Sequence, residues 1–509
     1  MIRIDEGICE GCRICEKNCP LGAIRVEGKL AVVGPGCASC NVCVRVCPFG
    51  AASRAEDEDA RHAPCSHCSV GCSIEEGHSG ACTRYVNRGG RIRRARKLVL
   101  KAGRGGPAAP KLPPEPLTTA VGAGTNYPCC RPAPYIVEDR FEGADVVTVV
   151  TEAPLSYSGV KVKIDANRYI GEEGARVKRD GKVVGHVTTE EYGSKMLSIG
   201  GANLLSHGND GFVVARTIVD FANGRRVKLR VEGGSELELQ HGHPPVIDGE
   251  EEALMRVGCG SATVGMFPEA LRAAADEAIV LDYHVIGLLT EHLAGAEIGL
   301  VHSGVVPRGV KSSRGRYFGN AGIGWGGTDI QSPLDAIASV DMAVARPGMT
   351  VLVTETTGQR CALLRLRENG LFQEIPLTPE AEAAAALIRG TCEQACVSVI
   401  YTGGTGGSAR AGVTKTPKKL NDAVHEGRVR MTVGGAPVFL LPGGGINFMV
   451  DIGRMAEDAV TWVPTPATVA PVEYTMEKAT YEALGGHTAH IITVAELLRQ
   501  LAEAEQEQG

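Results

Sequence analysis

The sequence predicts a mixed α/β or α+β protein of several domains, and three observations support this expectation. The chain has 509 residues, which is more than a single hydrophobic core usually holds. Beyond its amino-terminal part, apolar β-branched runs typical of strands alternate with Ala-, Leu- and Glu-rich stretches typical of helices. Twelve of the 18 cysteines fall within the first 82 residues, so the amino-terminal part has a composition of its own.

Two runs of four cysteines open the chain, CEGCRICEKNCP at 9–20 and CASCNVCVRVCP at 37–48. Both match the C-x2-C-x2-C-x3-C-P run of bacterial ferredoxins, in which the fourth cysteine of each run binds the cluster of the other. Residues 1–55 are therefore predicted to form a ferredoxin-like domain with two [4Fe–4S] clusters. A zinc site is the alternative, but zinc usually takes two separated pairs of ligands, which the duplicated order of eight cysteines disfavours.

The crossed arrangement assigns four ligands to each cluster. One cluster is expected at Cys9, Cys12, Cys15 and Cys47. The other is expected at Cys37, Cys40, Cys43 and Cys19.

A third group of thiols follows in a module predicted at 60–100, and its members are Cys65, Cys68, Cys72 and Cys82. Four thiolates with these spacings could hold a third [4Fe–4S] cluster or a structural zinc ion. We favour iron and sulfur, because the group directly follows two redox runs and three ligands again lie on one short loop. His67 and His78 are expected to cover this site rather than to bind in it.

The third group continues into a basic stretch at 84–104 that contains no acidic residue. Nucleic acid is not expected as a partner, because the whole chain carries a formal charge of −6 and the stretch lacks interleaved aromatic residues. The stretch either attracts a ferredoxin or similar acidic electron donor, or it is a solvated face.

A Gly- and Pro-rich segment at 101–117 is predicted to be a linker, and 118–509 to be a catalytic α/β region with room for two subdomains. Strands are predicted at 145–153, 182–189, 350–356 and 396–402. Helices are predicted at 268–278, 378–390 and 493–506. Gly-rich loops are expected between these elements, among them 308–333 and 402–419.

Two of these loops carry cations that suit an anionic substrate. Lys311, Arg314 and Arg316 lie in the first loop, and Arg410 and Lys415 lie in the second. A guanidinium group binds a carboxylate as a bidentate fork, and glycines let backbone N–H groups approach an anion. A solvated basic turn is the alternative for the first loop.

The acid–base candidates are Asp329 and Glu355, since Glu355 ends a predicted strand where reacting groups commonly sit. Cys129 and Cys130 form an adjacent pair beside Arg131 that could present a reactive thiol, or could be a turn without chemistry. Neither a Walker motif nor a convincing G-x-G-x-x-G follows a strand, so ATP and nicotinamide cofactors are not predicted.

The sequence shows no signal peptide and no apolar run near the roughly 18 residues of a membrane span, so we expect a cytoplasmic protein without a membrane partner. That compartment keeps thiols reduced, which suits metal binding by the clustered cysteines. A homo-oligomer is also expected.

Several longer segments resemble the 6-hydroxynicotinate reductase family: CSHCSVGCSIEEGHSGACTRYVN, APLSYSGVKVKIDANRYIGEEGARV, GHVTTEEYGSKMLSIGG, RGVKSSRGRYFG and GWGGT. The resemblance covers most of the chain. It implies ferredoxin-dependent partial reduction of a pyridine ring during anaerobic nicotinate degradation, with 6-oxo-1,4,5,6-tetrahydronicotinate as the product. It also implies iron–sulfur clusters and a possible flavin as cofactors.

Two other functions stay open at this stage. The chain could be an electron-transfer subunit of a larger redox complex, although the size of the carboxyl-terminal region disfavours this. It could instead be a cyclic-amide hydrolase or isomerase with accessory clusters, although three adjacent thiol groups disfavour that.

Overall fold

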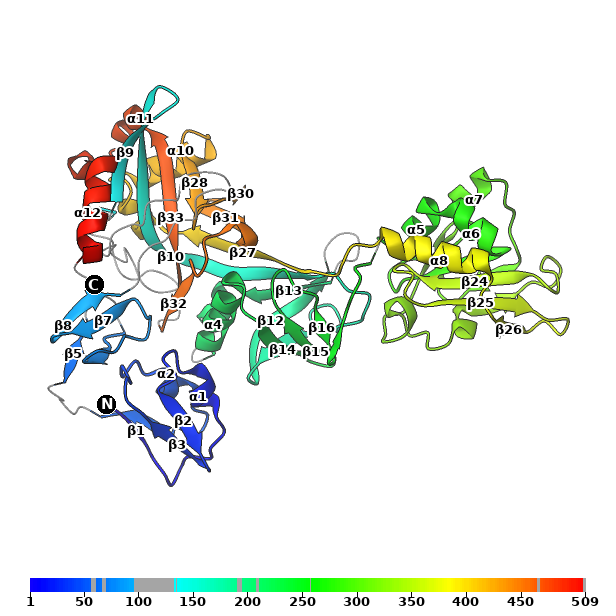
Figure 1. The fold of residues 1–509 in the computed structure, drawn as a ribbon, viewed down its shortest axis with the longest axis horizontal. Coiled ribbons are helices and arrows are strands. Elements are labelled where there is room, and N and C mark those ends of the chain that lie inside the picture. The colour runs from blue at the N-terminus through cyan, green and yellow to red at the C-terminus, as the bar shows by residue number, and fades with distance from the viewer. Residues whose placement is uncertain are drawn as a thin grey trace.

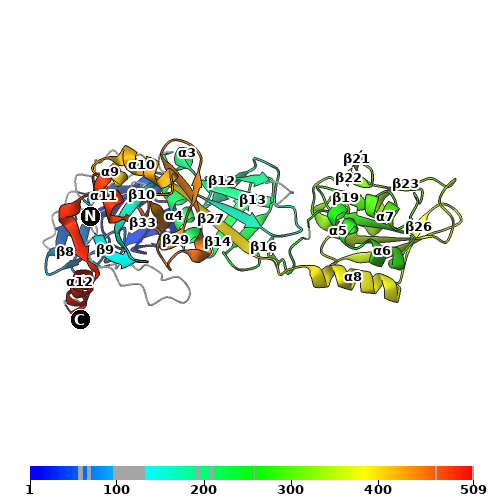
Figure 2. The same ribbon diagram turned by 90° about the horizontal axis from the view of Figure 1, so that it is seen from above.

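The computed structural model describes residues 1–55, 61–65, 70–95, 132–133, 135–189, 195–206, 210–256, 258–464 and 467–506. Two small cysteine-containing modules and a large β-rich unit lie together at one end of the molecule (Figure 1). A separate α/β unit lies at the other end, and the view from above shows the same division (Figure 2).

The first module is a ferredoxin-type fold in two similar halves. Its strands are β1 (Ile2–Ile4), β2 (Ile24–Glu27), β3 (Leu30–Val33) and β4 (Ala52–Arg54), and its helices are α1 (Ile14–Asn18) and α2 (Val42–Val46). Strand β1 pairs with β4, and β2 pairs with β3. Each helix is preceded by a left-handed residue, Arg13 at φ 63° and Asn41 at φ 64°, so the two cysteine runs adopt the same local backbone.

The second module consists of two short hairpins. Strands β5 (His62–Pro64) and β6 (Ser73–Glu75) form the first, and β7 (Tyr85–Arg88) and β8 (Arg91–Arg94) form the second. The backbone N–H of Ser73 donates to the carbonyl of Ala38 (3.0 Å), which fastens the first hairpin to the ferredoxin module.

The β-rich unit is built on β10 (Ala144–Ile164), a strand of 21 residues. Its partners are β9 (Tyr135–Phe141), β13 (Lys195–Gly200), β27 (Val397–Thr405) and β33 (Ala467–Glu477). The register of β10 against β27 shifts at a bulge between Ser156 and Gly159. Glycine is required at position 159, because a Cβ there would lie 2.8 Å from the carbonyl oxygen of Ile199. The sheet closes into a barrel whose interior is apolar.

The remaining strands of this barrel are β11 (Arg176–Arg179), β12 (Lys182–Thr189), β14 (Val227–Val231), β15 (Glu236–Leu239), β16 (Val246–Ile247), β17 (Glu250–Glu251), β28 (Arg430–Val433), β29 (Ala436–Pro437), β30 (Phe439–Leu441), β31 (Ile446–Asp451), β32 (Thr461–Val463) and β34 (Ile491–Thr493). Its helices are α3 (Ala202–Leu205), α4 (Gly211–Ala222), α9 (Gly407–Ala411), α10 (Pro417–His425), α11 (Lys478–Ala483) and α12 (Val494–Gln506). Short 3-10 turns occur at Ile452–Arg454 and Thr488–His490.

The α/β unit is inserted between β17 and β27. The segments that enter and leave it lie side by side and are paired by an isolated β-bridge between Leu254 and Gln394. Its strands are β18 (Glu277–Leu281), β19 (Ile286–Leu288), β20 (Val305–Pro307), β21 (Val310–Ser313), β22 (Arg316–Phe318), β23 (Ile337–Val340), β24 (Thr350–Glu355), β25 (Cys361–Leu366) and β26 (Phe372–Ile375). Its helices are α5 (Gly260–Met266), α6 (Pro268–Ala274), α7 (Leu293–Glu297) and α8 (Pro379–Thr391), with 3-10 turns at Trp325–Gly327 and Pro333–Ala336.

The predicted elements are confirmed, with differences at their ends. The strand predicted at 145–153 continues to Ile164, and the helix predicted at 268–278 ends at Ala274, where the chain turns into β18. The mixed α/β character is also confirmed, although most strand pairs are antiparallel and β18 with β24 is one of the few parallel pairs. Within the described ranges, no helix combines the length and apolar character that a membrane span requires.

Two stretches predicted as Gly-rich loops are regular structure instead. Residues 310–318 form the hairpin of β21 and β22, and the glycines Gly403 and Gly404 lie inside β27. Gly404 faces the Asn447 side chain of β31 so closely that a Cβ would lie 2.5 Å from its Oδ1. These glycines therefore allow close strand packing rather than a loop.

Candidate functional site

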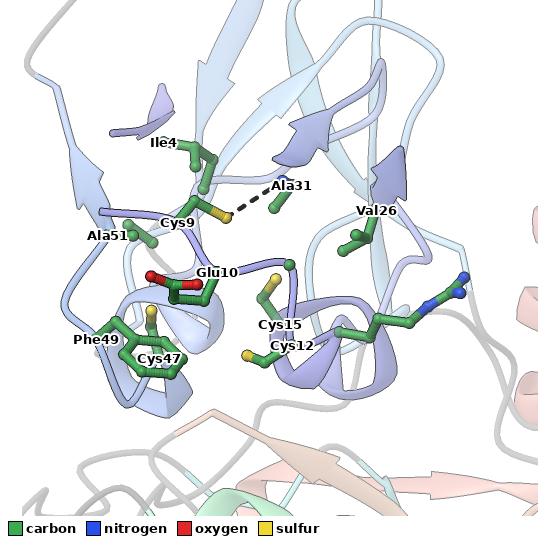
Figure 3. A pocket seen from close by; sticks show the side chains of 13 residues that line it. Ile4, Cys9, Glu10, Cys12, Cys15, Val26, Ala31, Cys47, Phe49 and Ala51 are labelled. Atoms are coloured by element: carbon green, nitrogen blue, oxygen red, sulfur yellow. Dashed lines mark hydrogen bonds between the residues drawn. The ribbon is translucent and has the colours of Figure 1, made fainter. Parts of the chain in front are cut away.

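Four thiols surround a cavity in the ferredoxin module (Figure 3). They belong to Cys9, Cys12, Cys15 and Cys47, so three come from the first run and one from the second. The backbone N–H of Ala31 donates to Cys9 Sγ (3.4 Å), which stabilises negative charge on that sulfur. Among the described residues, no three His, Cys, Asp or Glu side chains converge on a point suited to a single metal ion.

The other four thiols of the module form a second group, Cys19, Cys37, Cys40 and Cys43. The backbone N–H of Ala23 donates to Cys19 Sγ (3.3 Å), as Ala31 does in the first group. Cys19 and Cys47 end their helices with nearly the same dihedral angles, φ −68°, ψ 115° and φ −69°, ψ 114°. The fourth cysteine of each run is thus aimed in the same way.

Burial makes the thiolate form of these cysteines costly unless a positively charged group, such as iron, is bound to it. Burial raises the pKa of Cys15 to about 11 and the pKa values of Cys40 and Cys43 to about 12, and neighbouring thiols add to each shift. Without metal, these side chains hold their protons at neutral pH. Only the thiolate binds metal, so loading the site releases protons. The donor set therefore fits iron–sulfur clusters.

The third group of thiols packs directly against the second. Cys65, Cys72 and Cys82 share one apolar cluster with Ala38 and with Cys40 of the second group. The backbone N–H of Cys65 donates to the carbonyl of Cys72 (2.8 Å), which holds these two residues together just beyond the paired ends of β5 and β6. The predicted ligand Cys68 and the predicted covering residue His67 lie outside the described residues.

His78 lies between the two modules rather than among the thiols. Its ring lies so close to Gly36 that a Cβ there would be 2.6 Å from His78 Cδ2, and Gly36 precedes Cys37. Glu75 accepts a hydrogen bond from the backbone N–H of Gly36 (2.9 Å). Both contacts fasten the second module onto the loop of the second thiol group.

The third group also contacts the β-rich unit. Cys82 packs against Val463, Ala467 and Val469, which lie on or beside β32 and β33. Two residues further on, the Arg84 guanidinium forms an ion pair with Glu152 of β10, and the two side chains are only 3% and 4% exposed. Arg84 also donates to Thr461 Oγ1 (3.1 Å). The thiol path therefore ends on the central sheet of the β-rich unit.

The ferredoxin module makes a second contact with this unit, through its helices. Val42, Val46 and Cys40 pack against Phe212 of α4 and against Trp462. The guanidinium of Arg45 lies 5.2 Å from the centre of the Phe212 ring. Arg216 of α4 donates to Asn18 Oδ1 (2.9 Å).

The basic stretch at 84–104 is not a uniform surface, which corrects the sequence interpretation. Arg84 is buried and paired, so it belongs neither to a docking face nor to a solvated face. Arg88, Arg91 and Arg93 are exposed, as predicted for this stretch. The residues from 96 onward lie outside the described ranges.

The predicted acids lie in the α/β unit. Glu355 ends β24, is buried, and accepts a hydrogen bond from the backbone N–H of Gly326 (2.7 Å). Burial raises the pKa of Glu355, and the Arg360 guanidinium (3.4 Å) opposes this shift. Asp329 is partly exposed and forms an ion pair with Arg308 (3.0 Å).

The predicted substrate-binding cations are not brought together. Lys311 lies on β21 and pairs with Glu291 (2.8 Å), and Arg316 on β22 donates to Ser313 Oγ (2.7 Å). Arg314 occupies the turn between these strands. Arg410 lies on α9 and Lys415 follows it, so both belong to the β-rich unit at the other end of the molecule (Figure 2). The pair Cys129 and Cys130 lies outside the described residues.

Sequence reasoning missed the residues that join the modules, namely Arg84, Glu152, Phe212 and Trp462. It also missed Glu473, a buried carboxyl group on β33. One signal was available for both carboxyl groups: each stands alone inside an apolar run that forms a strand, TVVTEAPL and VAPVEYT. A charge in such a position requires a partner or a shifted pKa.

Two comparisons with known proteins found a match, one to the amino-terminal module and one to nearly the whole chain. Residues 2–25 match the family model described as a 4Fe–4S binding domain. A protein named 6-hydroxynicotinate reductase, from Eubacterium barkeri, is 54% identical over 499 residues, which is 97% of this chain and 100% of that protein. No solved structure matches the chain.

The buried ion pair gives the first prediction. Replacing Arg84 with Met leaves the Glu152 carboxylate buried without its cation, so the free energy of unfolding should fall by about 3–5 kcal/mol. The double variant R84M/E152M removes both charges and should recover most of that loss. Urea unfolding curves measure both values. The exposed neighbour Arg88 provides the control R88M, and equal losses in the single and double variants would contradict the pairing.

Proposed function

The chain belongs to the 6-hydroxynicotinate reductase family, and from this premise we propose that it reduces the ring of 6-hydroxynicotinate with electrons supplied through its cysteine modules. The product would be 6-oxo-1,4,5,6-tetrahydronicotinate. This conversion adds two electrons and two protons to the substrate. The electrons would come from a low-potential one-electron donor such as a reduced ferredoxin.

One observation carries this proposal: the three thiol groups are continuous in space and end on the central sheet of the β-rich unit. Cys40 belongs to the second group and packs with the third, and Cys82 of the third group packs against the cluster of Val463, Ala467 and Val469. Iron–sulfur clusters bound at these groups would carry single electrons at potentials that the surrounding hydrogen bonds and burial set.

We assign the ligands in crossed sets, because the cavity of the first group contains Cys47 from the second run. The first set is Cys9, Cys12, Cys15 and Cys47, and the second is Cys37, Cys40, Cys43 and Cys19. The third set would be Cys65, Cys72 and Cys82 together with Cys68. Its packing against Cys40 supports iron and sulfur there, with zinc as the alternative.

Electrons would enter at the first group. Cys12 is exposed, and the cavity beside it is lined by Phe49, an apolar side chain with 48% exposure. Ile8, which precedes the ligand Cys9 in the chain, is 45% exposed. The second group, in contrast, is covered by the third group and by α4. An exposed apolar rim around the entry suits brief docking of a redox protein.

The length of β10 bears on where the substrate ring can bind. This strand passes from Glu152, beside the third group, to Ile164 near the α/β unit, and twelve residues of strand span roughly 40 Å. Glu355, Asp329, Lys311, Arg314 and Arg316 lie beyond that end. Their roles as acid and anchor stay predictions, and they would require the ring to bind far from Cys82.

Further features of the proposal follow from composition and family. A reducing cytoplasm suits a chain with this many thiols. A flavin would supply the means to combine single electrons into a two-electron reduction. An anaerobic absorption spectrum with iron, sulfide, zinc and flavin content tests the cofactor list directly.

The function itself is tested with purified chain, reduced viologen and 6-hydroxynicotinate under anaerobic conditions. We expect a product heavier by two hydrogens, detected by mass spectrometry, and about twelve irons per chain if all three sets bind [4Fe–4S] clusters. Absence of ring reduction with full iron content would favour an electron-transfer subunit. About eight irons with one zinc would make the third module structural.

The crossed assignment predicts a specific pattern of iron loss. C47S should lose about four irons per chain, and C47S/C9S should lose no more, because both residues belong to one set. C47S/C37S should lose about four further irons. C396S changes a cysteine outside all three groups and serves as control. If C47S/C37S loses no more iron than C47S alone, the two runs bind their clusters separately.

The exit through the third group predicts a separation of two activities. In C82S, dithionite should still bleach the first two groups as in the unchanged protein, because their ligands are intact. The rate of ring reduction should fall at least about 100-fold, since the third set loses the ligand that packs against the β-rich unit and no longer passes electrons to it. Unchanged ring reduction in C82S would remove the third group from the path.

A further inference from the structure

A buried carboxyl group lies on the sheet face that the third thiol group covers, and the electron path leaves it without a role. Glu473 stands on β33 and is 4% exposed. It is in register with Val150 of β10 on one side and with Thr432 of β28 on the other. Directly paired residues of neighbouring antiparallel strands point to the same face, so these three side chains share one.

The carboxyl group is only partly satisfied. Its Oε2 accepts hydrogen bonds from Thr432 Oγ1 (2.5 Å) and from the backbone N–H of Gly435 (3.3 Å). Its Oε1 is buried and has no hydrogen-bond partner among the described residues. Burial raises the pKa of Glu473 to about 8, while the two hydrogen bonds lower it. At neutral pH the group therefore holds a proton.

Its distance from the thiols follows from the strand register. Val469, Pro471 and Glu473 share one face of β33, and Cys82 packs against the apolar cluster of Val463, Ala467 and Val469. Four residues of strand place Glu473 about 13 Å from Val469. Pro471 is paired with Glu152, so Glu473 and Glu152 are diagonal neighbours at roughly 7–8 Å.

Among the residues that the structure describes, few charged or titratable groups surround Glu473. Glu152 of β10 is neutralised by Arg84, and Tyr135 of β9 stands across Val150 in the same row. Arg430 is exposed and lies two residues before Thr432 on β28. Tyr474, the next residue of β33, points to the opposite face. None of these places a cation against the carboxyl group, which agrees with its protonated state.

We propose that Glu473 supplies one of the two protons of ring reduction, on the sheet face where the electrons leave the third thiol group. This inference rests on the proposed function. The O–H bond of Glu473 breaks, its proton passes to the ring as the ring takes up electrons from the external donor, and a new bond from hydrogen to the ring forms. The carboxylate then recovers a proton from water.

The test is the pH dependence of kcat for ring reduction, with reduced viologen as donor. The proton is available only below the pKa of Glu473, so kcat should fall as the pH rises through about 8. E473Q keeps the shape and neutrality of the protonated acid but cannot release a proton to the ring. In this variant kcat at pH 7 should be at least about 100-fold lower, and the decline of kcat with rising pH near 8 should disappear.

A second variant moves the profile without removing the acid. T432V deletes a hydrogen bond that favours the carboxylate, so the pKa of Glu473 should rise and the decline of kcat should shift to higher pH. A purely structural role for Glu473 would not produce a shift in this direction. E477Q, an exposed change of the same kind on the same strand, is the matched control.

The outcomes separate the two proposals. Iron content and bleaching by dithionite should be unchanged in E473Q, which shows that the electron path is intact. If the unchanged protein does not reduce the ring, the proposed function fails. If it reduces the ring but E473Q keeps the same kcat and pH profile, or T432V leaves the profile in place, the role of Glu473 is overturned.

Discussion

The ion pair between Arg84 and Glu152 determines where the cysteine modules meet the rest of the chain. Apolar contacts such as that of Cys82 with Val469 tolerate sliding, because they have no direction. A buried charge does not, since separating it from its partner costs several kcal/mol. Arg84 also donates to Thr461 Oγ1, so one guanidinium connects the module to β10 and β32 together. The exit of the thiol path is therefore held in a fixed register on the sheet.

The length of β10 separates this exit from the α/β unit. At that far end, Lys195 Nζ lies 5.5 Å from the ring centre of Tyr169 and 4.8 Å from that of Tyr283, which belongs to the inserted unit. Arg256 covers the same Tyr283 ring and pairs with Asp282 (2.9 Å). Cation–aromatic contacts of this kind help to join the two units. The contacts of Arg84 and those of Lys195 and Arg256 thus form two well-separated polar regions. Of these two, the region around Arg84 is the one beside the thiols.

Local patterns in the sequence predicted the parts that depend on local chemistry. The cysteine spacings predicted which thiols gather, since three of each four lie on one short loop, and the β-branched runs predicted the strands. The insertion of the α/β unit between β17 and β27 could not be predicted, because two distant strands pair across it. Arg84 was misinterpreted for the same reason: its partner Glu152 is 68 positions away, and nothing near Arg84 distinguishes it from its exposed neighbours. Glycines that serve close strand packing, as at Gly404, resemble loop glycines in the sequence, so the loop prediction there was wrong.

The position of Glu473 relative to the thiols links electron arrival to proton affinity. A cluster bound at the third group would, with each electron it accepts, add a negative charge near Val469, which is about 13 Å along β33 from Glu473. With an effective dielectric constant near 20, a charge at that distance would raise the proton affinity of Glu473 by about 1.3 kcal/mol, or about tenfold in its proton-binding constant. In the proposed path, the buried acid would therefore retain its proton while electrons accumulate. It would lose the proton only to a stronger base, and a ring that has just taken up an electron is such a base. An acid and an electron exit on one sheet face would thus make proton transfer follow electron transfer.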